Sequence, residues 1–585
     1  MTRLLLALVL AVLQETGPRP DSRAAVLAQC ADCHPTLAAS FARTGMARAL
    51  EPLRAGELAD LAPVEEAGTG FVYAFEGEGK GARLVETRSE GTWRDSAGLA
   101  FAIGAGELDR SFAVTRGKRL WLAPLEVLGH GSERHAALAP GHTIHPGARF
   151  SVPITPECLA CHTDSPPPRA WPLNLVPADW EPRGISCGAC HGDLAGHVKA
   201  KASELADEAA SPDDPLDRED DWSRVQRMER CAACHLQGDA RVELVPDRVG
   251  PPPPGTALLA TRAVFVAREP ADEIGFVSHV QRLVLSRCYL ESTGFPRGGL
   301  ACESCHDPHR SVFEPEERAR VRAACQRCHE PADAEAVRAS DCALPRSERP
   351  AERDCAACHM RKTGVFDVAE VEIHDHWIRR QPAAPSSGSV LRFPESADGD
   401  WRLFEWPGAP APERQQDPGL WTLALYHGNH FERAREFVER GEGAFAQDLP
   451  MLHHVRGSLF ERGGDYATAR AAYERALALD PELAEAAINL APVLAHEGQA
   501  QQGKDLLDAL IRRYPFADTA YRNRAAVRLA LSDDAGFRAD VEAAMKLLPD
   551  AALAQAYARY LAQRGDAAGE RRWNEEARWL DPRVP

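Results

Sequence analysis

The sequence predicts a mainly α-helical protein in two parts. The first is a cysteine-rich domain of short helices and long loops with a small inserted antiparallel sheet, and the second is a solenoid of paired helices. Three observations indicate this: seven Cys-x-x-Cys-His motifs, short runs of β-forming residues after the first motif, and prolines spaced 33 or 34 residues apart near the end. At 585 residues the chain is too long for one core.

The amino terminus has the composition of an export signal. Met1-Thr2-Arg3 precedes an apolar run over residues 4–13, and polar sequence follows. This run is too short for a comfortable membrane span, and its basic start is typical of a secretory signal. A short buried helix is the alternative. We expect residues 1–24 to be the signal, a periplasmic location, and no membrane span unless the signal stays uncleaved.

The overall charge limits the choice of partner. The chain has 68 basic and 86 acidic residues, which gives a formal net charge of -18. A nucleic-acid binder needs a basic footprint, so no nucleic-acid partner is expected. A partner protein that docks on this acidic chain by charge is expected to present a basic surface.

Fourteen of the 16 cysteines fall into seven copies of one motif. The copies are Cys30-Cys33-His34, Cys158-Cys161-His162, Cys187-Cys190-His191, Cys231-Cys234-His235, Cys302-Cys305-His306, Cys325-Cys328-His329 and Cys355-Cys358-His359. This spacing marks attachment of c-type haem. Two thiols three residues apart can both form thioethers with one porphyrin, and the adjoining histidine lies beneath the iron. The sequence therefore predicts about seven covalent haems and their iron.

Other uses of paired cysteines explain the motif less well. Zinc sites do not need a histidine at one fixed place seven times, thioredoxin-like pairs need a βαβ context, and disulfides leave the histidine unexplained. Cys288 and Cys342 lie outside the motifs. We expect them to form a disulfide in an oxidising compartment, with two separate buried thiols as the alternative.

Seven irons need up to seven further ligands, and histidines are dense beside the motifs. His309 follows His306 by three residues and cannot share its iron, because both would approach from one side; we expect it to cap a neighbouring haem. For a single histidine, the usual alternative is a surface or core position without a ligand role. Met46 is a candidate sulfur ligand to the first haem, and core packing is an equal alternative for it. The candidate second ligands are His197, His279, His309 and His376, then His142 and His145, then His130, His135 and His374, with Met46.

Composition divides the rest of the chain. β-forming runs separated by glycines predict a small antiparallel sheet over about 66–128 within a haem domain of residues 25–380, and Arg116-Gly117-Lys118 predicts a hairpin turn. Residues 381–415 are rich in Pro, Ser and Gly and indicate a linker. We expect the helical repeat domain to occupy residues 416–585.

The repeat has the tetratricopeptide pattern. Prolines recur at positions 481, 515, 549 and 582. The best unit combines small and bulky positions at Gly457, Phe460, Gly464, Tyr466, Ala469, Tyr473, Ala476 and Pro481. Small residues let two helices cross closely, and stacked pairs make a curved scaffold for protein contacts. The alternative to a protein-binding domain is a helical solenoid without a specific ligand.

From about residue 28 to the end, the chain resembles periplasmic multihaem c-type cytochromes with a C-terminal tetratricopeptide domain, and distantly the tetrahaem cytochrome family of nitrogen metabolism. The matching segments are Thr44-Gly45-Met46, Ile103-Gly104-Ala105-Gly106, Pro140-Gly141-His142, Gly184-Ile185-Ser186-Cys187, Cys234-His235-Leu236-Gln237-Gly238, Ser286-Arg287-Cys288, His306-Asp307-Pro308-His309, Cys358-His359-Met360 and Asp375-His376-Trp377-Ile378. The resemblance implies that His197, His279, His309 and His376 are distal ligands. Relatives often have histidine where this chain has Glu107-Leu108 and Glu370, so at least one haem is expected to be differently ligated or open.

Two functions compete. The first is electron transfer between redox partner proteins, with the repeats docking a partner. The second is a multihaem oxidoreductase that acts on a small nitrogen or sulfur compound at an open haem, which would also need acid–base groups. Every motif ends in His, whereas some multihaem reductases have Lys there, and this favours transfer. No catalytic residue is assigned. A scaffold dominated by the repeats is a third possibility.

Overall fold

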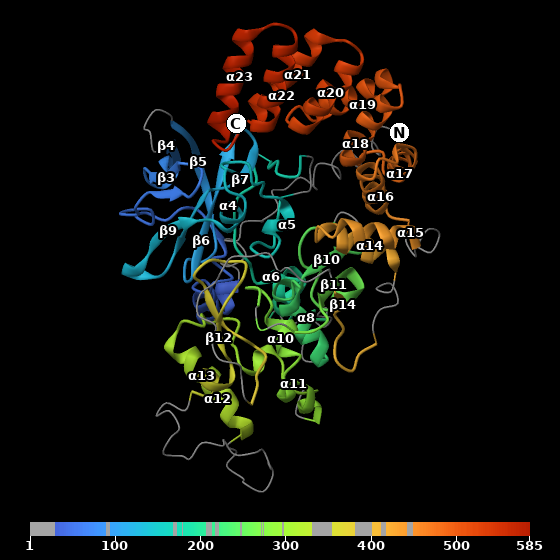
Figure 1. The fold of residues 1–585 in the computed structure, drawn as a ribbon. Coiled ribbons are helices and arrows are strands. Elements are labelled where there is room, and N and C mark those ends of the chain that lie inside the picture. The colour runs from blue at the N-terminus through green and yellow to red at the C-terminus, as the bar shows by residue number, and fades with distance from the viewer. Residues whose placement is uncertain are drawn as a thin grey trace, which may run out of the picture.

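A computed structural model describes residues 30–88, 94–167, 172–177, 179–205, 213–216, 221–245, 248–270, 272, 274–294, 298–329, 354–380, 400–410, 417–440 and 448–584. Figure 1 shows a β-sheet domain, a neighbouring region of short helices and loops, and an arc of paired helices beside both. Within these residues, every helix is too short or too polar to cross a membrane. The expected signal at 1–24 and Cys342 lie outside them.

Nine antiparallel strands form the first sheet. They are β1 (Leu50–Glu51), β2 (Val64–Glu66), β3 (Phe71–Glu76), β4 (Arg83–Arg88), β5 (Arg94–Ile103), β6 (Asp109–Arg116), β7 (Arg119–Leu122), β8 (Leu125–Leu128) and β9 (His135–Leu138). Hydrogen-bonded neighbours follow the order β2-β3-β4-β5-β6-β8-β9, with β1 on β5 and β7 on β6. The end strands β2 and β9 approach each other, so the sheet curls on itself.

This sheet corrects the expectation of a small insert at 66–128. It spans Leu50 to Leu138, so the N-terminal part is β-rich and not a domain of short helices. Strand β9 has the sequence His-Ala-Ala-Leu, and alanine is a poor strand former. Its register, from Leu125↔Leu138 to Leu128↔His135, is set by pairing with β8, which local sequence does not reveal.

The sheet core follows the alternation of its strands. Phe71 and Tyr73 on β3 pack with Phe112 and Trp121 from β6 and β7, and all four are buried. The predicted hairpin is confirmed, because Arg116 pairs with Arg119 across a two-residue turn. Gly117, the first residue of the turn, has a φ of 64°. Glycine reaches this left-handed conformation at little cost.

Short helices and loops make up the region after the sheet. Its α-helices, with one N-terminal helix, are α3 (Pro35–Phe41), α4 (Pro140–Ile144), α5 (Pro156–Leu159), α6 (Gly188–His191), α7 (Leu194–Leu205), α8 (Arg224–His235), α9 (Leu258–Thr261), α10 (His279–Leu283), α11 (Arg287–Glu291), α12 (Pro315–His329) and α13 (Cys355–His359). Strands β12 (Lys362–Gly364) and β13 (Glu372–His374) form a small hairpin. Helix α8 begins with a capping box between Ser223 and Gln226, which satisfies its first free N–H groups.

Part of the predicted linker is folded. Strand β14 (Trp401–Leu403) pairs with β11 (Arg262–Ala267), which also pairs with β10 (Ala240–Glu243). Trp406 is buried nearby, and its Nε1 donates to the Glu229 carboxylate at 3.1 Å. The Pro, Ser and Gly content around this segment does not reveal strand β14, because its partner β11 lies more than a hundred residues away in the sequence.

In the described part of residues 417–584, five helix pairs form the solenoid. Its helices are α14 (Pro418–His427), α15 (Phe431–Arg440), α16 (Pro450–Arg462), α17 (Tyr466–Leu479), α18 (Ala484–His496), α19 (Ala500–Arg513), α20 (Asp518–Ala530), α21 (Asp534–Leu547), α22 (Ala551–Gln563) and α23 (Ala567–Leu580). The four recurring prolines each follow the last residue of a second helix by two positions. The predicted helical repeat is therefore confirmed.

Both ends of the solenoid pack on the rest of the molecule (Figure 1). At its start, Trp421 of α14 contacts Phe265 of β11 edge to face, with ring centres 4.7 Å apart. At the last helix, α23, the carbonyl oxygens of Arg578 and Trp579 accept hydrogen bonds from Arg88 of β4. In the fourth helix pair, Asp518 of α20 forms a 2.7 Å ion pair with Arg119 of β7, and both side chains are buried. The solenoid therefore spans from the three-stranded sheet to the nine-stranded sheet.

Candidate haem sites

The motif cysteines lie on single turns of helix. Cys187 caps the start of α6 and Cys190 lies within it, and Cys231 and Cys234 lie in the last turns of α8. The other described motifs lie on or beside a turn of α- or 3-10 helix. Residues three apart on a helix share one face. The two thiols of each motif are thus placed for one porphyrin, as the thioether chemistry requires.

Backbone hydrogen bonds fix the motif histidines beside these thiols. The amide of His34 donates to the carbonyl of Cys30 at 2.7 Å, and His191 and His306 donate to Cys187 and Cys302 at 3.0 Å. Each bond closes one helical turn. The imidazole therefore follows the second cysteine in a fixed position, as an axial ligand beneath the porphyrin would.

Three motif histidines face a second imidazole at a distance that suits an intervening iron. Ring centres are 6.4 Å apart for His34 and His197, 6.0 Å for His191 and His309, and 6.3 Å for His306 and His376. With metal–nitrogen bonds of roughly 2 Å, two imidazoles on opposite sides of one metal have ring centres about 6 Å apart. These donor pairs fit a six-coordinate haem iron.

A fourth motif histidine also lies against a candidate ligand. The rings of His235 and His279 are 5.2 Å apart and nearly perpendicular, and His279 also lies 4.7 Å from His376. Nδ1 of His279 is buried and lacks a hydrogen-bond partner among the described residues. Buried imidazole nitrogen without a partner suits a metal-binding environment.

Orienting groups hold three of the candidate distal imidazoles through Nδ1. The Asp214 carboxylate lies 2.9 Å from Nδ1 of His197, and the Asp307 carboxylate lies 3.1 Å from Nδ1 of His309. Nδ1 of His376 donates to the carbonyl of His374 at 3.0 Å. A partner on one nitrogen fixes the ring and leaves Nε2 for a metal, as is usual for metal-binding histidines.

Burial keeps four of the imidazoles, those of His235, His279, His306 and His376, in the form that binds metal. Desolvation lowers the pKa of His376 to about 4, and it lowers the pKa of His235, His279 and His306 below their usual value. The neutral ring predominates at neutral pH, and neutral imidazole is the ligand form.

The remaining candidate ligands lie elsewhere. Nε2 of buried His142 is 2.5 Å from the Arg149 carbonyl oxygen. His130 lies 3.6 Å from Glu107, His135 lies 3.0 Å from Glu370, and His374 lies 3.0 Å from the Met360 carbonyl. His145 caps the end of α4, where its amide donates to the Gly141 carbonyl at 3.3 Å. Met46 is half-buried, and its carbonyl oxygen accepts hydrogen bonds from the amides of Ala49 and Ile185. Their roles as iron ligands stay predictions.

Three motif histidines face no imidazole among the described residues: His162, His329 and His359. His162 is half-buried and hydrogen-bonds the Ala49 backbone, and its buried Nδ1 has no partner in the described structure. Nδ1 of His359 donates to the Arg379 carbonyl oxygen at 2.9 Å. The sixth ligands of these three sites are not identified by ring contacts.

Thiols from different motifs lie side by side. Cys30 lies beside Cys187, Cys161 beside Cys234, Cys231 beside Cys302 and Cys325 beside Cys355. Together with the histidine pairs, these contacts link the seven motifs into one cluster. Cys288 is a free thiol among the described residues, and its predicted partner Cys342 lies outside them.

Sequence reasoning missed the groups that orient the ligands. The Arg282 guanidinium donates to the buried Asp375 carboxylate at 2.9 and 2.6 Å, and the Ser286 hydroxyl donates to the His376 carbonyl at 3.0 Å. These bonds hold the Asp375-His376 segment in place. Arg282 carries no local signal, whereas Asp307 could have been suspected from its place between His306 and His309.

Two comparisons identify parts of the chain. A family model described as "Doubled CXXCH motif" matches residues 296–334, and one described as "Tetratricopeptide repeat" matches residues 462–526. No curated protein matches the chain. The doubled motif indicates covalent binding of haem c, and tetratricopeptide repeats are commonly protein-interaction modules.

The solved structures with some similarity to the chain include proteins from Desulfovibrio magneticus and Thermus thermophilus. "MamA 41-end" from Desulfovibrio magneticus RS-1 is 15% identical, over 29% of this chain and 96% of that one, with a TM-score of 0.26. TTC0263, a thermophilic TPR protein in Thermus thermophilus, is 18% identical, over 29% and 92%, with a TM-score of 0.26.

Proposed function

We propose that this chain is a periplasmic multihaem c-type cytochrome that carries about seven covalent haems and transfers electrons between redox partner proteins. The observation that carries the proposal is the set of three imidazole pairs, His34–His197, His191–His309 and His306–His376, with ring centres 6.0–6.4 Å apart. Once bound, haem iron supplies one-electron redox chemistry. The protein's part is to attach, orient and pack these groups.

The arrangement of ligands supports transfer along a connected set of sites. His197 lies on α7, six residues after the motif histidine His191, but its ring faces His34. In the same way, His309 lies three residues after His306, but its ring faces His191. These two distal candidates therefore each belong to one site and are anchored in the peptide of another motif. Neighbouring sites are held close by three- and six-residue tethers, which limits how far apart they can move.

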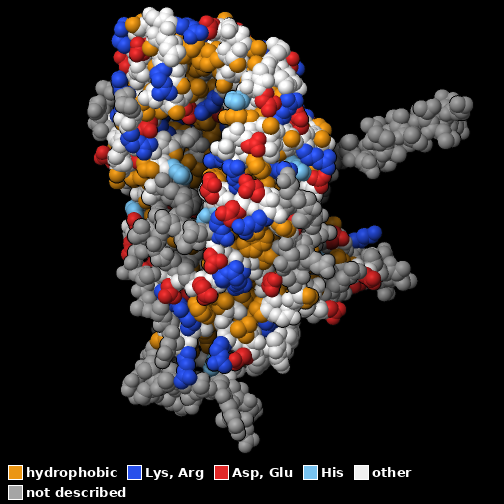
Figure 2. All heavy atoms as spheres, turned by 45° about the vertical axis from the view of Figure 1, so that its right-hand side comes forward, with side chains coloured by type: hydrophobic (Ala, Val, Ile, Leu, Met, Phe, Trp, Pro, Cys, Tyr) orange, Lys and Arg blue, Asp and Glu red, His pale blue; other side chains and the backbone are white. Residues whose placement is uncertain are grey.

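The surface supports a protein partner. Figure 2 shows basic and acidic side chains interspersed over one face, without the large basic stripe that a nucleic acid would need. The five helix pairs offer a scaffold of the kind that binds proteins. We place partner docking on this solenoid.

The test is to count and classify the haems in the full protein matured in a host that attaches haem c. Intact mass should show about seven added haems, and electron paramagnetic resonance should show low-spin iron with two histidine ligands at several sites. Periplasmic fractionation of the native host tests export. Protein that matures without added haem would refute the proposal.

A ligand variant tests the histidine pairs directly. We expect His309→Ala to convert one low-spin site to high-spin or weakly ligated iron, because His191 would lose its facing imidazole. The matched control is His453→Ala, since His453 lies on α16 of the solenoid beside Asp448 and is not a candidate ligand. Spectra of H309A that match those of the unmodified protein would show that His309 is not a ligand.

A second candidate function is a multihaem oxidoreductase acting on a small nitrogen or sulfur compound. The observation that favours it is His162, a half-buried motif histidine that faces no imidazole among the described residues. We would expect a high-spin signal in the unmodified protein and uptake of cyanide or carbon monoxide at one site. Complete low-spin ligation without uptake would exclude this function.

A further inference from the structure

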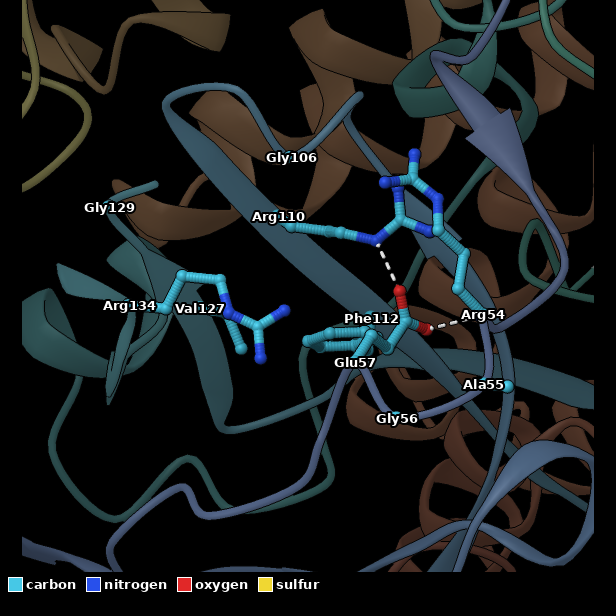
Figure 3. Close-up of a pocket in the computed structure, with 10 residues that line it drawn as sticks. All are labelled: Arg54, Ala55, Gly56, Glu57, Gly106, Arg110, Phe112, Val127, Gly129 and Arg134. Atoms are coloured by element: carbon cyan, nitrogen blue, oxygen red, sulfur yellow. Dashed lines mark hydrogen bonds and ion pairs between the residues drawn. The ribbon is translucent and has the colours of Figure 1, made fainter. Parts of the chain in front are cut away.

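A small pocket opens on the nine-stranded sheet, apart from the motif histidines and their candidate partners (Figure 3). It has a volume of about 170 Å³ and lies between the β1–β2 connection and the ends of β6 and β8. Its polar wall consists of Arg54, Glu57, Arg110 and Arg134, and Phe112 contributes to its apolar wall. Three guanidinium groups therefore converge around one carboxylate.

Arg110 is buried with part of its guanidinium unused. Its Nε lies 2.9 Å from Glu57, its Nη1 lies 3.0 Å from Glu51, and Nη1 also donates to the Gly104 carbonyl at 2.7 Å. Its Nη2 is buried and has no hydrogen-bond partner in the described structure. The side chain is only 5% exposed, so this N–H group needs a partner inside the pocket.

Arg134 supplies a second guanidinium group with N–H donors available to the pocket. It follows the short 3-10 turn Gly131–Glu133, and Figure 3 shows its side chain extending into the pocket toward Phe112 and Glu57. No ion pair joins it to a described residue, whereas Arg54 is paired with Glu51. Counting Glu51 and Glu57 against the three arginines leaves one positive charge in a protein whose net charge is -18.

We propose that this pocket binds a small oxyanion, with Nη2 of Arg110 and the guanidinium of Arg134 as its main donors. Guanidinium groups bind anionic oxygens through short charge-assisted hydrogen bonds. The volume equals that of several water molecules, at about 30 Å³ each, which suits a phosphate- or sulfate-sized ion and is too small for a nucleotide. The proposal is independent of the haem assignment, because none of the candidate iron ligands lines the pocket.

The test is isothermal titration calorimetry of the full-length haem-loaded protein at low ionic strength. Inorganic phosphate, sulfate and nitrite are titrated separately, so the three arms distinguish tetrahedral dianions from a planar monoanion. We expect saturable binding of at least one of them at a single site. Arg134→Gln should weaken that binding by at least about tenfold, the loss expected for a hydrogen bond to a charged group.

Two further variants make the test specific. Arg94→Gln removes an arginine from the opposite end of β5, where it pairs with Glu76, and should leave affinity unchanged. Glu57→Gln removes the carboxylate that lines the pocket and should tighten binding, because it relieves repulsion of the anion. Haem absorbance and circular dichroism verify that each variant is folded.

The outcomes separate cleanly. Tighter binding in E57Q and weaker binding in R134Q, with R94Q unchanged, would support the site. Absence of saturable binding for all three anions would overturn it, as would equal affinity in R134Q and the unmodified protein. Loss of affinity in R94Q to the same extent as in R134Q would show a general charge effect and would also overturn it.

Discussion

Single residues explain why the candidate ligands are held so firmly. His197 and His309 each lie beside a carboxylate through Nδ1, and His376 is fixed by the carbonyl of His374. The segment that carries His376 is further tied down by the buried Arg282–Asp375 ion pair. Such partners set both the tautomer and the ring orientation, which positions Nε2 before any metal is bound.

Another buried residue gives the sheet domain a pH-dependent stability. Glu126 on β8 is fully buried, and burial together with the nearby Asp109 raises its pKa to about 8, although the Ser111 hydroxyl opposes the shift. Its ordinary value is 4.5. Between pH 4.5 and about pH 8, the folded protein therefore holds one more proton than the unfolded chain. Its free energy of unfolding falls as the pH rises through this range.

We predict that Glu126→Gln removes this loss. The unmodified protein should melt at a lower temperature at pH 9 than at pH 6, with a contribution from this residue of up to about 1.4 kcal/mol per pH unit in the window. The variant should melt at similar temperatures at both values. Thermal unfolding measures this, with exposed Glu65→Gln as the control. A pH dependence that is unchanged in E126Q would refute the assignment.

At the scale of elements, the repeat helices follow from their own sequence. Gly457 on α16 faces Tyr473 on α17, and a Cβ at this glycine would lie 2.5 Å from the tyrosine ring. The Tyr473 hydroxyl, in turn, donates to Glu461 at 2.6 Å. The small and bulky positions read from the sequence are therefore the ones that set this helix crossing.

We predict that Gly457→Ala destabilises the protein by about 1–3 kcal/mol, because the buried tyrosine ring has to move. The measurement is the shift in the thermal or denaturant midpoint. Gly81→Ala is the control, since no heavy atom lies within 4 Å of a Cβ built there and its φ is negative or extended. If both variants lost equal stability, the effect would come from the glycine backbone and not from the crossing.

The elements differ in how far the sequence predicts them. The helix pairs and the Gly117 turn follow from local periodicity and backbone chemistry. Strands β9 and β14 do not, because Ala-rich and Pro-flanked segments become strands only when a distant partner supplies the hydrogen bonds. The same holds for the site: the motif and its nearby histidines are visible in the sequence, whereas the pairing of His197 with His34, 163 positions away, depends on tertiary structure.

At the scale of the whole molecule, the solenoid is connected at both ends. Its first helices share a core with β10, β11 and β14. Near its other end, the carbonyl oxygens of Arg578 and Trp579 accept bonds from Arg88 of β4 at 2.8 and 3.1 Å. Because of these contacts, the repeats and the nine-stranded sheet should unfold together, and a partner bound to the solenoid would be held at a defined position relative to the haem sites.

The Arg119–Asp518 pair is the strongest test of that coupling. Both side chains are less than a tenth exposed, and Arg119 also donates to Asn174 at 2.9 Å. Removing one partner of a buried pair leaves an uncompensated charge, which costs about 3–5 kcal/mol. We therefore predict that Asp518→Ala lowers the unfolding temperature and splits one calorimetric transition into two, as the sheet and the last repeats separate.

Two variants control this prediction. Asp505→Ala removes an exposed carboxylate from α19 and should leave a single transition. The double variant Arg119→Met with Asp518→Leu removes both charges and should recover part of the lost stability, since apolar replacements of a buried pair are often tolerated. A single unshifted transition in D518A would mean that the solenoid and the sheet are independent, and that partner docking on the repeats is not positioned by this contact.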